Sequence, residues 1–301
     1  MTHHAPAVRR RKLGAELRRL RGQSGVTSGE AARLVGWHQS KVSRIETGSS
    51  GVKPADLERL LDAYGVGDPG LRTVLAALSG GTAPDGPPGP YGAPDDGRAA
   101  RGWWQAYREA LPAAYRDFIA LESEAAQART LETHVIPGLL QTSAYAEQVT
   151  RAALGAEADR ERVAALVEVR ARRQRVLRSA RPLRLDVVLD EAALRREVGG
   201  REVMREQLAH LVTAGQLPHV RLQVLPFGAG VHIGVTGPFV IFSFSRMADL
   251  DVVVLDHLTG SLHLEQQDEL RAYSTAFATL RARALSYDDS LAFLAALGEG
   301  R

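Results

Sequence analysis

Leucines at helical spacing dominate the first 78 residues of the chain. They recur every three or four positions and predict amphipathic helices, the first of which has a strongly basic outer face. Glycines end these segments, and Pro54 suits the start of a later helix. The apolar positions are Leu13, Leu17 and Leu20 in the first helix, and Leu57, Leu60, Leu61 and Tyr64 in the fourth. About five helices in this stretch predict a compact all-α domain over residues 9–78.

Residues 27–46, TSGEAARLVGWHQSKVSRIE, have the spacing of a helix-turn-helix. Ala32 is small where two helices must cross closely, and Gly36 lies where a tight turn needs a positive φ. Val42 and Ile45 are three residues apart and predict the inner face of a second helix. In such a motif the second helix enters the major groove of DNA.

Outward-facing polar residues of that second helix are the candidates for reading DNA. Gln39 and Ser40 lie at its start and are best placed for base edges, and a glutamine can pair with adenine. Ser28 and the first amides of the preceding helix could hold a phosphate. We predict base contacts from Gln39, Ser40, Ser43 and Arg44, and phosphate contacts from Thr27, Ser28, Lys41, Thr47, Ser49 and Lys53. The alternative is that Lys41 and Arg44 are ordinary solvated charges.

A segment rich in glycine and proline divides the chain. Residues 79–98, SGGTAPDGPPGPYGAPDDGR, contain six Gly and five Pro without apolar periodicity. This composition predicts a partly extended linker over residues 79–101 and a second domain over 102–301. The aromatic group that follows, Trp103, Trp104 and Tyr107, could open the second core or form an exposed patch. We favour the core, because large aromatic residues usually bury at a domain edge.

The second domain mixes helical and strand patterns. Helical patterning runs through roughly residue 178, with a break at Pro137-Gly138, and the segment Val231–Gly237 reads as a glycine-containing loop or a strand. Strands are predicted at Leu183–Leu189, Val220–Leu225, Phe239–Phe244 and Asp251–Leu255, and helices near Glu191–Arg196, Arg201–Ala214 and Glu265–Leu285. Helices gathered around a small mixed sheet predict an α+β domain.

Charge separates the two halves of the chain. Residues 1–78 carry 13 Lys/Arg and 7 Asp/Glu, a net charge of +6, whereas the whole chain carries +3, so the remainder carries −3. A basic first domain favours a polyanion as partner. The chain has no cysteine, no apolar run near the ~20 residues of a membrane span and no signal-peptide pattern. We therefore expect a cytoplasmic protein, associated with the nucleoid when it binds DNA, and no membrane partner.

Candidate chemistry in the second domain is weak. His232, His257 and His263, with Asp256 or Glu265, match no metal-binding spacing, and GxSxG is absent. Asp190-Glu191 suits a helix N-terminus as well as a catalytic pair. We expect no metal, no cofactor and no enzymatic activity. A pocket or partner surface could involve Leu139, Leu140, Tyr145, Phe227 and His232, near Pro137, with ordinary packing as the alternative.

Both halves resemble known families. The segment GWHQSKVSRIETG resembles Xre/Cro-like helix-turn-helix regulators of the actinobacterial type, and VVLDEAALRREVGG, VRLQVLPFGAGVH and VVVLDHLTGSLHLE resemble the DUF5753 domain. This resemblance implies a transcriptional regulator, often encoded beside a small DUF397 protein. Relatives often carry a phosphate-binding Gln where this chain has Ser28.

The resemblance and the size of the motif together suggest how the protein works. One motif grips one half-site, so we expect a homodimer on a double-stranded DNA operator. The dimer surface could be residues 265–285 or 104–130, and the second domain would sense a small-molecule effector or a partner. The alternative is an antitoxin-like module that binds a small DUF397-type protein and autoregulates its operon.

Overall fold

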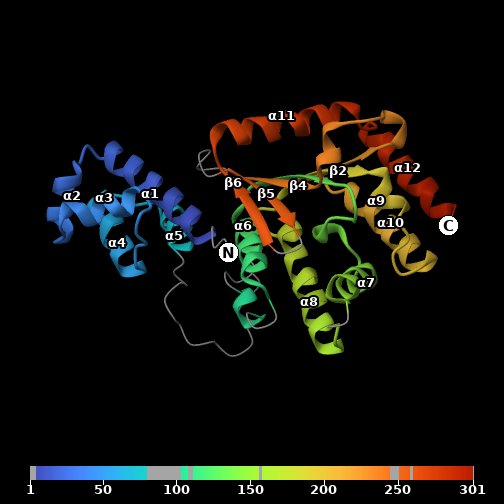
Figure 1. Ribbon diagram of the computed structural model, residues 1–301, viewed down its shortest axis with the longest axis horizontal. Coiled ribbons are helices and arrows are strands. Elements are labelled where there is room, and N and C mark those ends of the chain that lie inside the picture. Colours follow the sequence, from blue (N-terminus) through green and yellow to red (C-terminus); the bar gives the residue numbers. More distant parts are fainter. Residues whose placement is uncertain are drawn as a thin grey trace. The chain divides into compact units, whose positions relative to one another are not determined.

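The computed structural model describes residues 5–79, 103–107, 111–155, 158–244, 251–257 and 260–300 (Figure 1). The chain divides into two compact units, residues 1–94 and 95–301. The predicted linker lies outside the described residues, apart from residue 79. No helix in the described ranges is long and apolar enough to cross a membrane.

The first unit is the predicted all-α domain. Its helices are α1 (Ala5–Gln23), α2 (Ser28–Val35), α3 (Gln39–Glu46), α4 (Pro54–Ala63) and α5 (Pro69–Leu78). All the leucines singled out by their spacing lie in one core, together with Ala32, Val42, Ile45 and Tyr64. The helical periodicity therefore identified the buried faces of α1 and α4 correctly.

The second unit contains a six-stranded mixed sheet, which confirms the α+β fold class. The strands are β1 (Gln127–Glu132), β2 (Arg184–Asp190), β3 (Val220–Leu225), β4 (Phe239–Ser243), β5 (Val252–His257) and β6 (Gly260–Leu264). Their order across the sheet is β3-β2-β1-β4-β5-β6. The pairs among β1, β2 and β3 are parallel, and β4, β5 and β6 add antiparallel pairs.

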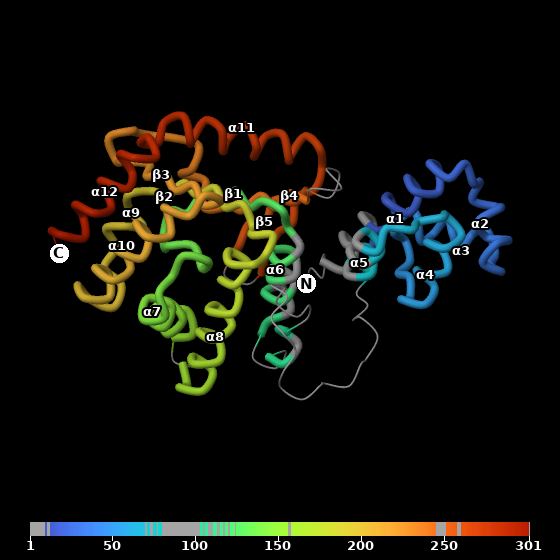
Figure 2. The backbone as a smooth tube through the Cα atoms, turned by 180° about the vertical axis from the view of Figure 1, so that it is seen from behind, coloured from blue at the N-terminus to red at the C-terminus, as the bar shows by residue number. Residues whose placement is uncertain are grey.

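Helices cover both faces of the sheet. On one face α11 (Gln267–Arg283) packs Phe277 and Leu280 onto the strands. On the other face lie α7 (Ser143–Leu154), α10 (Arg201–Gly215) and α12 (Tyr287–Glu299), with Tyr145, Leu208 and Leu294 in the core. Figure 2 shows α11 along one side of the strands and α7, α8 and α10 on the other. The remaining helices are α6 (Ala113–Glu124), α8 (Arg160–Arg173) and α9 (Glu191–Arg195).

Two strands depart from the sequence prediction. β1 lies inside the stretch predicted as helical and occupies a central place in the sheet, and β6 was not predicted at all. The segment Val231–Gly237 contains a short 3-10 helix, Ile233–Thr236, and no strand. These corrections enlarge the small sheet expected from the sequence to six strands.

The aromatic group after the linker forms a small cluster of its own. Trp103, Trp104 and Tyr107 are half-buried and pack against Leu111, Ile119 and Val169. The Trp103 ring lies edge-on to those of Trp104 and Tyr107, at centroid distances of 6.0 and 6.2 Å. The core assignment is therefore correct in part, because these rings keep some exposure to solvent.

Candidate nucleic-acid interface

The turn between α2 and α3 is fixed by backbone geometry. Gly36 ends α2 with φ 69°, the left-handed conformation that glycine adopts most easily. The Trp37 amide donates to the Ala32 carbonyl over 2.7 Å, and the His38 imidazole accepts the Ser40 amide at the start of α3. The predicted helix-turn-helix is therefore present with its expected glycine turn.

The inner face of α3 is held against α1 at close range. Val42 and Ile45 are 0% and 2% exposed, as predicted. A Cβ atom built on Gly14 of α1 would lie 2.4 Å from the Ile45 carbonyl oxygen and 2.7 Å from that of Glu46. Only glycine fits at this crossing. The close approach of α1 therefore fixes the position of the C-terminal end of α3 within the first unit.

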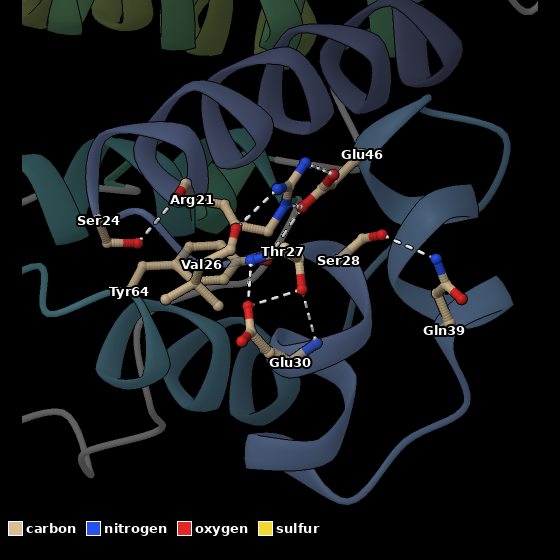
Figure 3. Close-up of polar contacts among 9 residues, drawn as sticks. All are labelled: Arg21, Ser24, Val26, Thr27, Ser28, Glu30, Gln39, Glu46 and Tyr64. Atoms are coloured by element: carbon tan, nitrogen blue, oxygen red, sulfur yellow. Dashed lines mark hydrogen bonds and ion pairs between the residues drawn. The ribbon is translucent and has the colours of Figure 1, made fainter.

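A buried polar network ties the same end of α3 to its neighbours (Figure 3). The Arg21 guanidinium donates to both carboxylate oxygens of Glu46, over 2.8 and 3.0 Å, and the Tyr64 hydroxyl donates to Glu46 Oε1 over 3.0 Å. The hydrogen bond to Glu46 raises the pKa of Arg21, and burial raises that of Tyr64. Glu46 therefore has a structural role, in which it joins α3 to α1 and to Tyr64.

The outer face of α3 carries the four predicted base-contacting residues, and all are exposed. Gln39 Nε2 donates to Ser28 Oγ over 3.0 Å, and Ser40 Oγ lies 2.9 Å from His38 Nδ1. Ser43 and Arg44 form no side-chain hydrogen bond or ion pair with any residue that the structure describes. The first two side chains are therefore oriented by neighbours, and the other two are free to meet a ligand.

The predicted phosphate contacts at the start of α2 already have partners in the protein. The Thr27 hydroxyl donates to Glu30 Oε2 over 2.7 Å in a capping box, and Ser28 accepts the Gln39 amide. These bonds from Thr27 lower the pKa of Glu30, so its carboxylate stays ionised at the helix N-terminus. A phosphate would meet that negative charge, which weakens the case for Thr27 as a phosphate contact.

Lys41 is engaged within the first unit as well. Its ammonium lies 2.9 Å from Asp56 Oδ2 and 3.6 Å from the centroid of the Trp37 ring. Asp56 was not singled out from the sequence, because an acid in the first turn of a helix is ordinary. Lys41 therefore reaches a phosphate only if Asp56 releases it.

The loop after α3 holds the remaining predicted phosphate contacts. Thr47 Oγ1 and Ser49 Oγ lie 2.9 Å apart, and both residues are exposed. Lys53 is exposed immediately before α4, and its side chain has no hydrogen-bonding or ionic partner among the described residues. Thr47 and Ser49 directly follow the C-terminal end of α3, where Thr47 Oγ1 donates to the Arg44 carbonyl over 3.3 Å, and polar and basic side chains there are suited to contact a DNA backbone.

Removing the Asp56 carboxylate is expected to strengthen DNA binding. Asp56→Asn would free Lys41 for a phosphate, so affinity should rise several-fold at low salt, and the plot of log K against log salt should steepen by about 0.9. Fluorescence anisotropy across a salt series measures both quantities. Glu58→Gln makes the same charge change on α4 at a residue that pairs with Arg72, and it should leave the slope unchanged. An unchanged slope in Asp56→Asn would show that Lys41 does not reach DNA.

Three residues proposed for a pocket or partner surface in the second unit are core residues. Leu139, Leu140 and Tyr145 are 5%, 1% and 0% exposed. The Tyr145 hydroxyl accepts the Ile136 amide, and Gln207 Nε2 donates to the Leu140 carbonyl over 2.7 Å. The chain after Pro137 looks like a surface loop in sequence but folds inward, so these side chains serve packing.

The other two residues of that set lie on an exposed apolar segment, residues 226–237. Asp190 Oδ2 lies 3.4 Å from His232 Nε2, and Glu191 Oε2 accepts the Phe227 amide over 2.8 Å. Arg283 donates to the carbonyls of Ala229 and Val231. The segment nevertheless exposes its large apolar side chains: Phe227 58%, Val231 84%, Ile233 50% and Val235 72%.

No group of three or more His, Cys, Asp or Glu in the described part of the chain could hold a metal ion. Both residues of the Asp190-Glu191 pair make structural contacts: Asp190 caps α9, and Glu191 accepts the Phe227 amide and pairs with Arg195. Glu132, at the end of β1, has a strongly shifted pKa. Burial raises its pKa to about 8, and the negative charge of Asp256 adds to this shift.

Glu132 is expected to make the stability of the second unit depend on pH. Its pKa is about 8 when folded and near 4.5 when unfolded, so the folded state binds more protons between these values. The free energy of unfolding should therefore fall as pH rises from about 5 to 8. Urea denaturation of the full chain at both pH values measures this, and Glu132→Gln should reduce the fall. The exposed Glu202→Gln on α10 is the control that should keep it.

Comparison with protein families covers both units. A family described as a helix-turn-helix domain matches residues 12–75, and one described as a domain of unknown function, DUF5753, matches residues 115–296. Comparison of the chain with curated proteins and with solved structures found no match. The second match spans more than half of the chain, and the first coincides with the α1–α5 unit. A helix-turn-helix domain is typical of a DNA-binding regulator. The chain therefore belongs to the DUF5753 family and carries a helix-turn-helix domain before its DUF5753 domain.

Proposed function

We propose that the protein is a sequence-specific transcriptional regulator that inserts α3 into the major groove of an operator. The observation that carries this proposal is the division of α3 into two faces. Val42, Ile45 and Glu46 hold it in the core, while Gln39, Ser40, Ser43 and Arg44 face solvent. A fixed helix with exposed polar side chains at its start is suited to contact base edges.

Gln39 is the strongest candidate for direct readout. The hydrogen bond from its Nε2 to Ser28 orients the side chain and leaves Oε1 free to accept, as from the amino group of adenine. Arg44 carries an unpaired guanidinium one turn further along and can reach guanine or phosphate.

Mobility shifts on the DNA upstream of its own gene test this assignment. Gln39→Ala and Arg44→Ala should each weaken specific binding by about 1–3 kcal/mol. Gln39→Ala should leave the salt slope unchanged, because no charge is lost. Arg205→Ala removes an exposed arginine of α10 and should leave specific affinity unchanged. If both α3 variants bind like the wild type, another surface reads the DNA.

We also propose that the protein acts as a homodimer and that its second domain is a non-catalytic sensing or interaction domain. The exposed apolar segment supports a protein contact, since soluble monomers rarely keep such side chains together on their surface. The same segment favours the alternative of an antitoxin-like module that binds a small DUF397-type protein. The backbone of residues 226–237 is held by hydrogen bonds from Arg283 and to Glu191, so these apolar side chains are exposed in the folded protein.

Analytical ultracentrifugation of the full chain separates these possibilities. Wild type should sediment as a dimer, and the double variant Val231→Asp with Val235→Asp should sediment as a monomer. A dimeric variant would place the dimer contact elsewhere. A monomeric wild type would contradict the homodimer and favour a surface for a different protein, tested by adding a purified candidate from a neighbouring gene.

A further inference from the structure

A cavity of about 460 Å³ opens at the outer edge of β3 in the second unit. Its walls come from the α10–β3 turn, from β3 itself, from the last turns of α11 and from the start of α12, elements that can be followed in Figure 2. The lining residues are Gln216, Leu217, Pro218, Val220, Arg221, Gln223, Arg281 and Tyr287. This volume lies within the range of small-molecule sites.

The charge of the cavity is uniformly positive. Two arginines line it, and no aspartate or glutamate is among the lining residues. Neither Arg221 nor Arg281 forms an ion pair with a carboxylate in the described part of the chain, whereas Arg151, Arg172 and Arg173 pair with glutamates. Unpaired guanidinium groups around a recess favour an anion, which they can bind through two parallel hydrogen bonds.

Gln223 organises this recess. Its Nε2 donates to the carbonyls of Arg281 and Leu285, over 3.4 and 2.9 Å, which turns its Oε1 toward Arg281 Nε at 3.3 Å. The guanidinium of Arg281 is thereby held at one nitrogen, while its two terminal nitrogens have no partner among the described residues. A donor pair held in this way loses little conformational freedom when an anion binds.

The edge of β3 is closed to another strand. The Val224 amide donates to Ser290 Oγ over 3.0 Å, and the Val224 carbonyl accepts the Leu285 amide over 2.8 Å. At the other end of the strand, the Val220 amide donates to the Leu217 carbonyl. Because the outward backbone groups at both ends are used, an added strand could not pair along β3. The recess therefore suits a compact molecule and not an extended peptide.

We propose that this cavity binds a small organic anion, one carboxylate or phosphate group attached to an apolar body. Arg221 and Arg281 would hold the anionic group, and the apolar body would lie against Leu217, Val220 and the ring of Tyr287. The inference deepens the proposed sensing role of the second domain and rests on that role for its biological purpose. It does not depend on which surface reads DNA.

Isothermal titration of the full chain without DNA tests the proposal. Phenyl phosphate and benzoate are the probes, and benzyl alcohol is the neutral analogue. Saturable binding of at least one anion is expected, with no binding of the alcohol, and Arg221→Gln and Arg281→Gln should each weaken it about tenfold. The relative affinity of the two anions distinguishes phosphate from carboxylate recognition. Arg205→Gln makes the same charge change away from the cavity and should bind like the wild type.

Two results would overturn the site. One is the absence of saturable binding by both anions. The other is binding that survives both arginine substitutions, provided that thermal melting shows each variant to be folded. Either result leaves the DNA-reading proposal intact, because that is measured separately with Gln39→Ala and Arg44→Ala.

Discussion

Replacing Gly14 with alanine should destabilise the first unit by about 3 kcal/mol. The added Cβ would lie 2.4 Å from the Ile45 carbonyl oxygen, and a backbone atom cannot rotate away as a side chain can. The intrinsic preference of helices for alanine, about 1 kcal/mol, offsets only part of this cost. The end of α3 would be pushed outward, so DNA binding should fall with stability. Hydrogen exchange of the full chain, measured in peptides from residues 13–46, detects the change.

A second glycine of α1 provides the matched control. Gly22 has no neighbouring atom within 4 Å of the position where its Cβ would lie, so Gly22→Ala should stabilise the unit by about 0.5–1 kcal/mol. Peptides from residues 184–225 serve as an internal reference in both variants. If Gly14→Ala were as stable as Gly22→Ala, the close crossing of α1 and α3 would be wrong.

Replacing Arg173 with methionine should cost the second unit about 3–5 kcal/mol. Arg173 and Glu122 are 7% and 4% exposed, and two hydrogen bonds of 2.7 Å join them. The same guanidinium donates to the Tyr115 hydroxyl over 2.6 Å and lies 5.0 Å from the centroid of the Phe118 ring. Removal of the arginine would leave the Glu122 carboxylate buried without its counter-charge. Urea denaturation followed by hydrogen exchange in residues 115–178 measures the loss.

The double variant Glu122→Met with Arg173→Met distinguishes an unpaired charge from lost packing. Two apolar side chains of similar length would fill the site without a buried charge, so most of the stability should return. If the double variant were as unstable as Arg173→Met alone, the loss would come from the contacts with Tyr115 and Phe118 and not from the carboxylate.

Local patterns were sufficient to predict the first unit and the outer face of its recognition helix. The spacing of Leu13, Leu17 and Leu20 defines a buried stripe, and Gly36 is needed for the turn. The inward positions of Val42 and Ile45 leave Gln39 and Arg44 exposed by geometry alone. Such features depend on residues within one or two helical turns of each other, and this separation is what periodicity detects.

Features set by distant partners could not be predicted in this way. Lys41 and Asp56 are 15 positions apart, and nothing in either segment indicates that they form an ion pair. β1 has the sequence QARTLE, and its buried residues are the alanine, the threonine and the leucine. The alternation of apolar and polar residues expected of a strand is therefore weak, and a helical pattern precedes it. Its strand conformation comes from pairing with β2 and β4 on either side. Tertiary pairing overrides local preference at such a position.

The two faces of α3 have a consequence for how such a regulator changes its target. The buried residues of α3 are Val42, Ile45 and Glu46, whereas its four exposed residues contribute little to stability. Mutations at Gln39, Ser40, Ser43 and Arg44 can therefore accumulate one at a time while each successive variant stays folded. A chimera that carries another regulator's residues at these four positions should keep this protein's melting temperature and adopt the other regulator's operator. Evolution of a new binding site would then require only a few surface substitutions on an unchanged scaffold.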